Sequence, residues 1–271
     1  MQGSSRGAAA AARKALAETL QQPGVDWSVL AEELFAVTGA LDSSAALRRA
    51  LADPSREPQV KRDLAARLFG GKVGEATGNL VGVAVSGRWS SERDLSDTTE
   101  ELAVETVMAM AEAGGRLDSV EDELFRFGRV VAGNPGLRDA LTDRHAGRTA
   151  KAQLVSSLLE GKASDETVRL ARQAVLAPRG RRFDRVLESY LAIAARRREQ
   201  LTATIISAAP LDDAQRDRLT AALSSMYEKQ VLANVIVDPE VLGGLRIQIG
   251  DEVVDGTIAR RLDEAKRKLI G

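Results

Sequence analysis

The chain of 271 residues contains no cysteine, which excludes disulfides, thiol nucleophiles and thiolate metal sites at once. This is consistent with a reducing compartment. His145 is the only histidine, and it lies in a polar segment without a second imidazole with which to share a metal ion. We therefore expect His145 to be a solvated loop residue and predict no metal site.

Aromatic residues make up only 3% of the chain, whereas alanine, leucine and arginine are abundant. This composition favours helices that pack through small aliphatic side chains. Long hydrophobic runs are also missing, since the longest uncharged segment (residues 76–87) has 12 residues and a membrane-spanning helix needs about 20. We expect a soluble protein without direct membrane insertion, held at a membrane only by something else.

The sequence also has little net charge, −1 from 38 basic and 39 acidic residues, so no overall field points to nucleic acid. One basic cluster, Arg179 to Arg198, holds seven arginines. Only Phe183 and Tyr190 could stack on bases there, so a solvated or protein-contacting face is the better interpretation. A helical RNA-binding or regulatory adaptor that uses this face stays as the alternative function.

The glycine-rich and acidic segments do not match a catalytic motif. Gly70-Gly71-Lys72 follows a predicted helix and lacks P-loop spacing, and Gly243-Gly244 leads into a predicted strand instead of a helix N-terminus. Glu121, Asp122 and Glu123 have the positions of helix N-terminal charges. We predict no catalytic residue and no cofactor site.

Most of the chain has helical periodicity, and the pattern repeats. Helices are predicted over residues 8–20, 26–41, 60–69, 73–85 and 92–113, and a turn or short helix over 47–51. From residue 118 onward the same plan recurs at an offset of 90 residues without a gap, with Leu34-Phe35 matching Leu124-Phe125 and Lys61 matching Lys151. Two copies indicate a duplicated domain, since a solenoid needs about three or more. A further helix is predicted over 183–199.

The last 70 or so residues have a different pattern. Strands are predicted at 201–208, 231–237, 245–249 and 252–254. A helix that buries Leu219, Ala222, Leu223 and Met226 follows a capping box of Asp212 and Gln215. Gly250-Asp251 predicts a two-residue hairpin turn, and Asp255-Gly256-Thr257 precedes a final helix with Ile258, Leu262 and Leu269 on one side. The order is β-α-β-β-β-α.

The ordered run from Asp238-Pro239 through Leu242-Gly243-Gly244-Leu245, Gly250-Asp251 and Asp255-Gly256 to the final helix resembles the C-terminal signature of the delta subunits of F-type ATP synthases, the family of the oligomycin-sensitivity-conferring protein. Residues 103–124 resemble the start of that family's helical N-terminal domain. The resemblance covers roughly residues 95–271, and the long form with a duplicated helical domain looks like actinobacterial members.

The expected fold is therefore mostly α, with two related helical-bundle domains and a small α+β C-terminal domain. The expected domains are an extra helical copy (1–94), the helical domain usual in the family (95–199) and the C-terminal domain (200–271).

The resemblance implies a non-catalytic stator subunit, one copy per complex, peripheral at the cytoplasmic face of the cell membrane. Family members bind N-terminal helices of the alpha subunits through the helical domain and the C-terminal end of the peripheral-stalk b subunit through the C-terminal domain. They hold the catalytic head still while the rotor turns during proton-driven ATP synthesis.

A partner helix should bind in a groove between helices. We expect Val107 and Ala111 to face Val186 and Tyr190 in the second helical domain. In the first, Ala11 and Ala15 should face Leu95 and Leu102. For the stalk we expect contacts from Leu219, Leu223, Met226, Ile258, Leu262 and Leu269. Ordinary core packing is the competing interpretation for each of these side chains.

Overall fold

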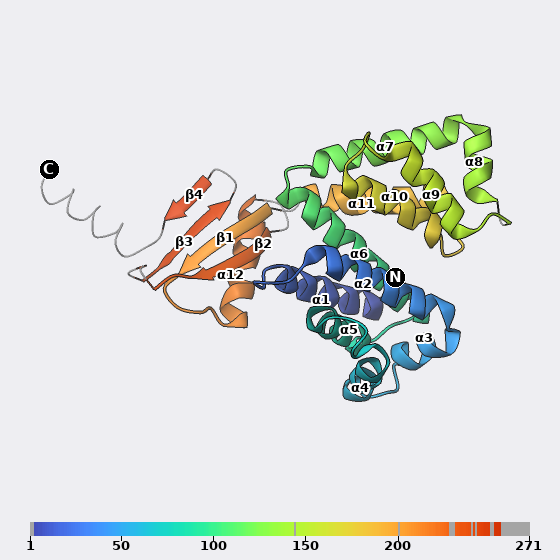
Figure 1. Cartoon of the computed structure of the whole chain (residues 1–271). Helices are drawn as coiled ribbons and strands as arrows, with labels where there is room; N and C mark the ends of the chain where they lie inside the picture. Colours follow the sequence, from blue (N-terminus) through green and yellow to red (C-terminus); the bar gives the residue numbers. More distant parts are fainter. Residues whose placement is uncertain are drawn as a thin grey trace, which may run out of the picture. The chain divides into compact units, whose positions relative to one another are not determined.

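The fold is taken from a computed structural model, which describes residues 3–143, 145–199, 201–227, 231–239, 241, 243–249 and 252–255. The chain divides into two compact units, Met1–Arg197 and Arg198–Gly271. The first unit is helical, and the second combines a helix with a small sheet (Figure 1).

The helical unit contains eleven helices in its described part. They are α1 (Gly3–Leu20), α2 (Trp27–Ser43), α3 (Ala45–Ala52), α4 (Pro58–Phe69), α5 (Glu75–Ser86), α6 (Glu92–Ala113), α7 (Leu117–Gly133), α8 (Pro135–Thr142), α9 (Arg148–Leu159), α10 (Asp165–Leu176) and α11 (Phe183–Glu199). The helices predicted from periodicity are confirmed, with shifts of a few residues at their ends.

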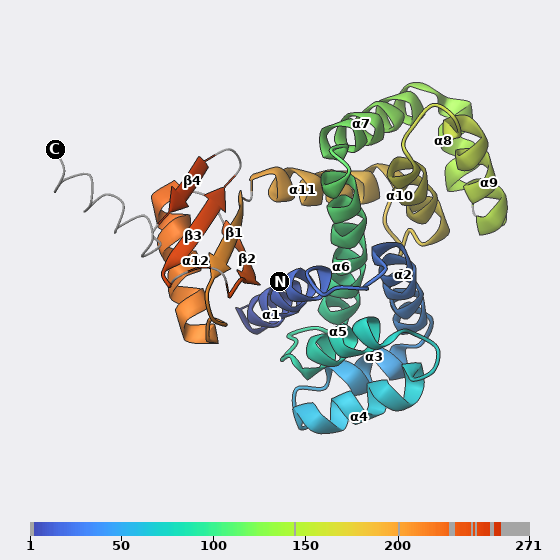
Figure 2. The ribbon, with the colours of Figure 1, turned by 60° about the vertical axis from the view of Figure 1, so that its left-hand side comes forward.

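Helix α6 is the central element of this unit. Figure 2 shows it between α1–α5 and α7–α10. Ser91 caps its N-terminus by accepting a hydrogen bond from the Arg93 amide, and 13 of its 22 residues are buried. A helix buried on most sides must be surrounded by other helices. Residues 94 and 95, between which a domain boundary was expected, both lie in the first turn of α6.

Four consecutive helices begin and end at positions 90 residues apart: α2 and α7, α3 and α8, α4 and α9, and α5 and α10. Their local hydrogen bonds recur at the same offset. Ser44 caps α3 through the Leu47 amide, and Asn134 caps α8 through the Leu137 amide. These side chains satisfy amides that have no partner within the helix. His145, as expected, is an exposed loop residue.

The second unit has a four-stranded mixed sheet of β1 (Leu201–Ser207), β2 (Val231–Val237), β3 (Leu245–Ile249) and β4 (Glu252–Asp255), in the order β2-β1-β3-β4. β1 and β2 are parallel and are connected by α12 (Asp213–Tyr227), whereas β1–β3 and β3–β4 are antiparallel. Ile249 pairs with Glu252, which confirms the hairpin. Its turn residues Gly250 and Asp251 and the predicted final helix lie outside the described residues.

The core of this unit consists of Ala203, Ile205, Leu223, Val231, Ile247 and Ile249. The predicted capping box is confirmed, because the Gln215 amide donates to Asp212 Oδ1 (2.7 Å) and the Asp212 amide donates to Gln215 Oε1 (3.0 Å). The prediction that α12 buries Ala222 and Met226 is wrong, since Ala222 is exposed and Met226 is 71% exposed. The buried line has a spacing of four through Leu219, Leu223 and Tyr227, and Met226 lies beside it.

Candidate functional site

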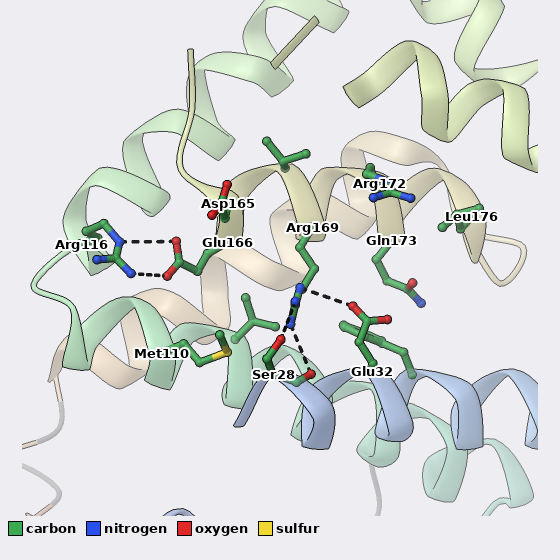
Figure 3. A pocket seen from close by; sticks show the side chains of 13 residues that line it. Ser28, Glu32, Met110, Arg116, Asp165, Glu166, Arg169, Arg172, Gln173 and Leu176 are labelled. Atoms are coloured by element: carbon green, nitrogen blue, oxygen red, sulfur yellow. Dashed lines mark hydrogen bonds and ion pairs between the residues drawn. The ribbon is translucent and has the colours of Figure 1, made fainter. Parts of the chain in front are cut away.

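A groove of about 600 Å³ in the helical unit lies between α2 and α10, with α6 as its third wall (Figure 3). Its apolar lining comes from Phe35, Val107, Met110, Val168 and Leu176, and its polar lining from Ser28, Glu32, Arg116, Asp165, Glu166, Arg169, Arg172 and Gln173. The groove therefore lies where the first half of the helical unit meets the second.

Arg169 on α10 bridges this groove to α2. It donates to Ser28 Oγ (2.7 Å) and to the Ser28 carbonyl oxygen (3.4 Å), and it lies 3.4 Å from a Glu32 carboxylate oxygen. On the other side, Arg116 donates to Glu166 (2.6 Å). Burial opposes ionisation of Glu166, but the hydrogen bond and charge of Arg116 outweigh it, so the pKa of Glu166 lies below its ordinary value. The groove's polar groups thus hold the chain's own helices together.

A second polar cluster is buried nearby and centres on Glu100 of α6, whose side chain is 4% exposed. Glu100 accepts hydrogen bonds from Arg179 (2.7 Å), Arg181 and Tyr190 (3.2 Å). Burial together with the charge of Glu100 raises the pKa of Tyr190 well above its ordinary value. This cluster connects α6 to α11 and to the loop before it.

Arg179 extends the cluster to α2. Its guanidinium, 8% exposed, also pairs with Asp42 at the end of α2 and with Asp97 (2.8 Å). Burial alone would lower the pKa of Arg179. The hydrogen bonds and charges of the three carboxylates have the larger, opposite effect, so its pKa lies above its ordinary value. Its backbone has φ 56°, the left-handed region that non-glycine residues seldom adopt. Because these contacts fix several elements at once, the cluster rigidifies the junction of the two halves.

The expectation of a solvated or protein-contacting basic face at Arg179–Arg198 fails for Arg179 and Arg181, whereas the side chains of Arg182 and Arg185 are 79% and 69% exposed as expected. Arg179 is buried in the cluster above, and Arg181 pairs with Glu100. Further ion pairs along this segment are Arg182–Asp184, Arg185–Glu188, Arg196–Glu105 and Arg197–Glu112. Each of these arginines therefore pairs with a carboxylate of the chain itself. Asp184 and Glu188 are neighbours in sequence, whereas the partners of Arg179, Arg181, Arg196 and Arg197 lie up to 137 residues away, where no local pattern reveals them.

The residues expected to line partner grooves lie as follows. Val107, Ala111, Val186 and Tyr190 all belong to the hydrophobic core of the helical unit and are at most 1% exposed. Leu95 and Leu102 are equally buried, whereas Ala11 is exposed and Ala15 half-buried. In the second unit Leu223 is buried, Leu219 partly buried and Met226 exposed. Ile258, Leu262 and Leu269 lie outside the described residues.

The structure describes four of the signature residues of the second unit, Asp238, Gly243, Gly244 and Asp255. Gly243 and Gly244 have φ of 76° and 86°, which confirms them as turn glycines. The Asp238 amide donates to the Ser207 carbonyl oxygen (2.9 Å) and so fixes the end of β2 to β1. Asp255 ends β4, whereas Gly250, Asp251 and Gly256 lie outside the described residues.

Metal-binding clusters and membrane spans are both missing from the described part of the chain. No group of three or more histidine, cysteine, aspartate or glutamate side chains there could hold a metal ion. None of the helices there is both long and apolar enough to cross a bilayer.

Sequence reasoning missed two kinds of residue. Glu100 and Arg179 are 79 positions apart, and no local pattern pairs them. Glu33 and Glu123 were detectable, because both are glutamates at the 90-residue offset. Glu33 accepts hydrogen bonds from the Gly74 amide (2.9 Å) and the Thr77 hydroxyl at the start of α5. Glu123 does the same for Ser164 and Thr167 (2.6 Å) at the start of α10.

The described residues form a mostly helical unit and a small unit with a mixed sheet. Buried charged side chains of the helical unit, such as Glu100 and Arg179, pair with one another and so stabilise the fold. A family profile described as "ATP synthase delta (OSCP) subunit" matches residues 104–269. The chain is 50% identical to the ATP synthase subunit delta of Kineococcus radiotolerans, over 99% of this chain and 98% of that protein. It is 49% identical to that of Streptomyces avermitilis (98% of each chain) and 43% identical to that of Thermobifida fusca (100% of each).

The chain belongs to the ATP synthase delta (OSCP) subunit family. It is a non-catalytic stator subunit of the proton-transporting ATP synthase, a membrane-associated complex.

Proposed function

We propose that the two units of this stator subunit bind different parts of the synthase. The helical unit binds N-terminal helices of the alpha subunits, and the C-terminal unit binds the C-terminal end of the peripheral-stalk b subunit. The observation that carries this proposal is that the family match, residues 104–269, runs through both compact units of one chain. A connector needs two separate binding units joined covalently, and the two compact units of this chain are suited to that role.

In this proposal one copy per complex lies at the cytoplasmic face of the membrane and resists the torque on the catalytic head. A connector under torque must transmit force without local unfolding. The Glu100–Arg179 cluster supports this role, because breaking a buried ion pair is strongly unfavourable. No group in the helical unit needs to perform chemistry.

We further propose that the helical unit consists of two related domains, an extra copy over about residues 1–94 and the usual family domain over about 95–199, followed by the C-terminal domain from 200. The equal bounds of four helix pairs and the matched roles of Glu33 and Glu123 support this proposal. The first turn of α6 would then close the first domain, and the rest of α6 would open the second.

For binding to the alpha subunits, the first domain offers the more accessible version of the expected groove. On α1 Ala11 is exposed and Ala15 half-buried, whereas Leu95 and Leu102 of α6 are buried. In the second domain, Val107, Ala111, Val186 and Tyr190 would support a groove from beneath. For the stalk contact, Met226 and Leu219 on α12 are the accessible candidates, with Ile258, Leu262 and Leu269 beyond them in sequence.

Cross-linking of the assembled synthase followed by mass spectrometry tests this division. We expect cross-links from residues 3–197 to N-terminal segments of the alpha subunits, and from residues 201–271 to the C-terminal end of the b polypeptide. Cross-links of both units to the same partner, or absence of the chain from the purified synthase, would contradict the proposal. Salt-sensitive retention of RNA by the chain would instead support the alternative adaptor function.

A further inference from the structure

Helices α2 and α7 are matched at an offset of 90 residues, but one phenylalanine has opposite surroundings in the two. Phe35 on α2 is 6% exposed, whereas Phe125 at the matched position of α7 is 57% exposed. The neighbouring matched leucines, Leu34 and Leu124, are both fully buried, so the two helices bury the same inner line. The difference concerns only the outer face.

On α2 the chain itself covers this outer face. Ser28 and Glu32 contact Arg169 of α10, and Phe35 lines the groove formed with α6 and α10 (Figure 3). At the far end of α2, Asp42 binds Arg179. The covering elements thus supply apolar side chains in the middle and an arginine near each end.

On α7 the matched positions are Asp118, Asp122, Phe125 and Ala132. All four are exposed, and we call them the α7 face. Arg129, also exposed, lies one turn from Phe125 on the same side. A single exposed apolar side chain is common on a protein surface, so the observation that carries weight is that the matched face of α2 is covered.

We propose that the α7 face binds an amphipathic helix of another synthase subunit, which carries an arginine or lysine about one turn from the apolar side chain that packs on Phe125. The contact that Arg169 of α10 makes with α2, beside the groove lined by Phe35, is the template for this contact. The inference rests on the proposed function, since it assumes that the helical unit binds helices of its neighbours, and it assigns one such contact to α7.

Charge identifies which end of the partner helix carries the cation. The N-terminal part of the α7 face has Asp118 and Asp122, where α2 has Ser28 and Glu32, so it attracts a cation more strongly than the template does. Asp122 already pairs with Arg126 (2.9 Å), but both side chains are more than half exposed. Such a surface pair contributes little and can be exchanged for a better one.

At the C-terminal end of the α7 face, the negative charge that Asp42 provides on α2 is absent. Ala132 replaces Asp42, and Arg129 replaces Gly39. A second cation on the partner, in the place that Arg179 takes on α2, would therefore be repelled by Arg129. The α7 face fits a helix with its positive charge opposite Asp118 and Asp122 and neutral or acidic residues opposite Arg129.

The absence of cysteine allows a direct test by single-cysteine labelling. Phe125→Cys and Val130→Cys place one thiol each on α7 at nearly equal exposure, 57% and 58%. The two positions differ by about 140° around the helix, because successive residues turn by about 100°. Val130→Cys is therefore a matched control outside the α7 face.

The maleimide reaction rate of each thiol is measured in the free full-length chain and in the assembled synthase. We expect Phe125→Cys to react about tenfold or more slowly after assembly, because the centre of an interface excludes solvent. Val130→Cys should react at the same rate in both states. A photoreactive label at Phe125→Cys should then attach to a helical segment with a basic residue next to an apolar one.

Equal rates for Phe125→Cys in the free chain and in the synthase would overturn the inference and leave the proposed function intact. Attachment of the label to the chain's own C-terminal unit, to a non-helical segment or to RNA would also overturn it. Absence of both labelled chains and the unmodified chain from the synthase would instead refute the proposed function. If folded Phe125→Cys fails to assemble while Val130→Cys assembles, the inference is supported, because only the α7 face differs.

Discussion

In the first half of the helical unit Glu33 of α2 holds the start of α5, and in the second half Glu123 of α7 holds the start of α10 through the same kind of hydrogen bonds. The inner residues Leu34 and Leu124 are equally buried. The outer residues Phe35 and Phe125 are not, because α10 and α6 cover the first and no described element buries the second.

This comparison distinguishes residues that stabilise the fold from residues whose outer side chains contact other elements or face solvent. The matched caps and inner leucines maintain a helical framework in either half. The outer faces differ, since α2 contacts the chain itself through Arg169 and Arg179, whereas α7 presents Asp118, Asp122 and Phe125 to solvent.

The largest effect is expected at the junction of the halves. Glu100→Ala leaves Arg179 and Arg181 with less compensation in a buried site, so it should lower the free energy of unfolding by about 3–5 kcal/mol. Glu101→Ala is the matched control, because Glu101 pairs with Arg13 at the partly exposed surface. Its cost should be about 1 kcal/mol or less. Urea denaturation measures both, and equal losses would show that the cluster does not stabilise the junction.

The two phenylalanines should differ next most. Phe35→Ala removes a buried ring beside a groove that can partly collapse, so we expect a loss of about 3 kcal/mol, the low end for such changes. Phe125→Ala should cost about 0.5 kcal/mol or less in the free chain, because most of the ring is already in water. Denaturation of the two variants side by side checks this asymmetry. Similar losses would mean that α7's outer face is covered within the chain.

The caps should behave alike in both halves. Glu33→Ala and Glu123→Ala should each lower stability by about 1–2 kcal/mol, because each leaves donors at a helix start without their acceptor. A loss confined to one variant would contradict the matched roles of the two carboxylates.

Glu123 also has a pH signature. Burial raises its pKa, but the hydrogen bonds from Thr167 and Ser164 outweigh this and hold it below the ordinary 4.5. The unfolded chain therefore takes up this proton first as the pH falls. The stabilisation by Glu123 is complete above about pH 4.5 and is lost as the pH falls through the folded-state pKa. Glu123→Gln should lack this component in denaturation curves taken across that range, and an unchanged pH dependence would refute the assignment.

The smallest effect is expected where α10 meets α2. Arg169→Ala removes a pair with Glu32, which is 61% exposed, and hydrogen bonds to Ser28, for an expected loss of about 1 kcal/mol. Arg126→Ala on α7 removes only an exposed pair with Asp122 and should cost about 0.5 kcal/mol or less. Denaturation midpoints distinguish the two. A larger loss of stability for Arg126→Ala would contradict the expectation that the contacts on α2 stabilise the chain more than those on α7.

The repeated framework could be predicted from the sequence because it depends on local periodicity and on identical residues at one offset. The positions of the strands along the chain and the hairpin were predictable from alternating side chains and the turn residues, whereas the order β2-β1-β3-β4 within the sheet was not predicted. The buried ion cluster was not, because Arg179 meets Asp42 from 137 residues away and its neighbours in sequence look like a solvated basic run. The exposure of Phe125 was not predictable either, since Leu-Phe occurs at both matched positions and burial depends on what packs outside the helix.

The most direct test of the account compares amide hydrogen exchange of the full-length chain, free and within the assembled synthase. Exchange reports local opening and its suppression by contacts. We predict that α7 gains protection on assembly while α2, already covered by α6 and α10, changes little. Equal gains on both helices, or no gain on α7, would contradict the claim that the two matched faces serve different partners.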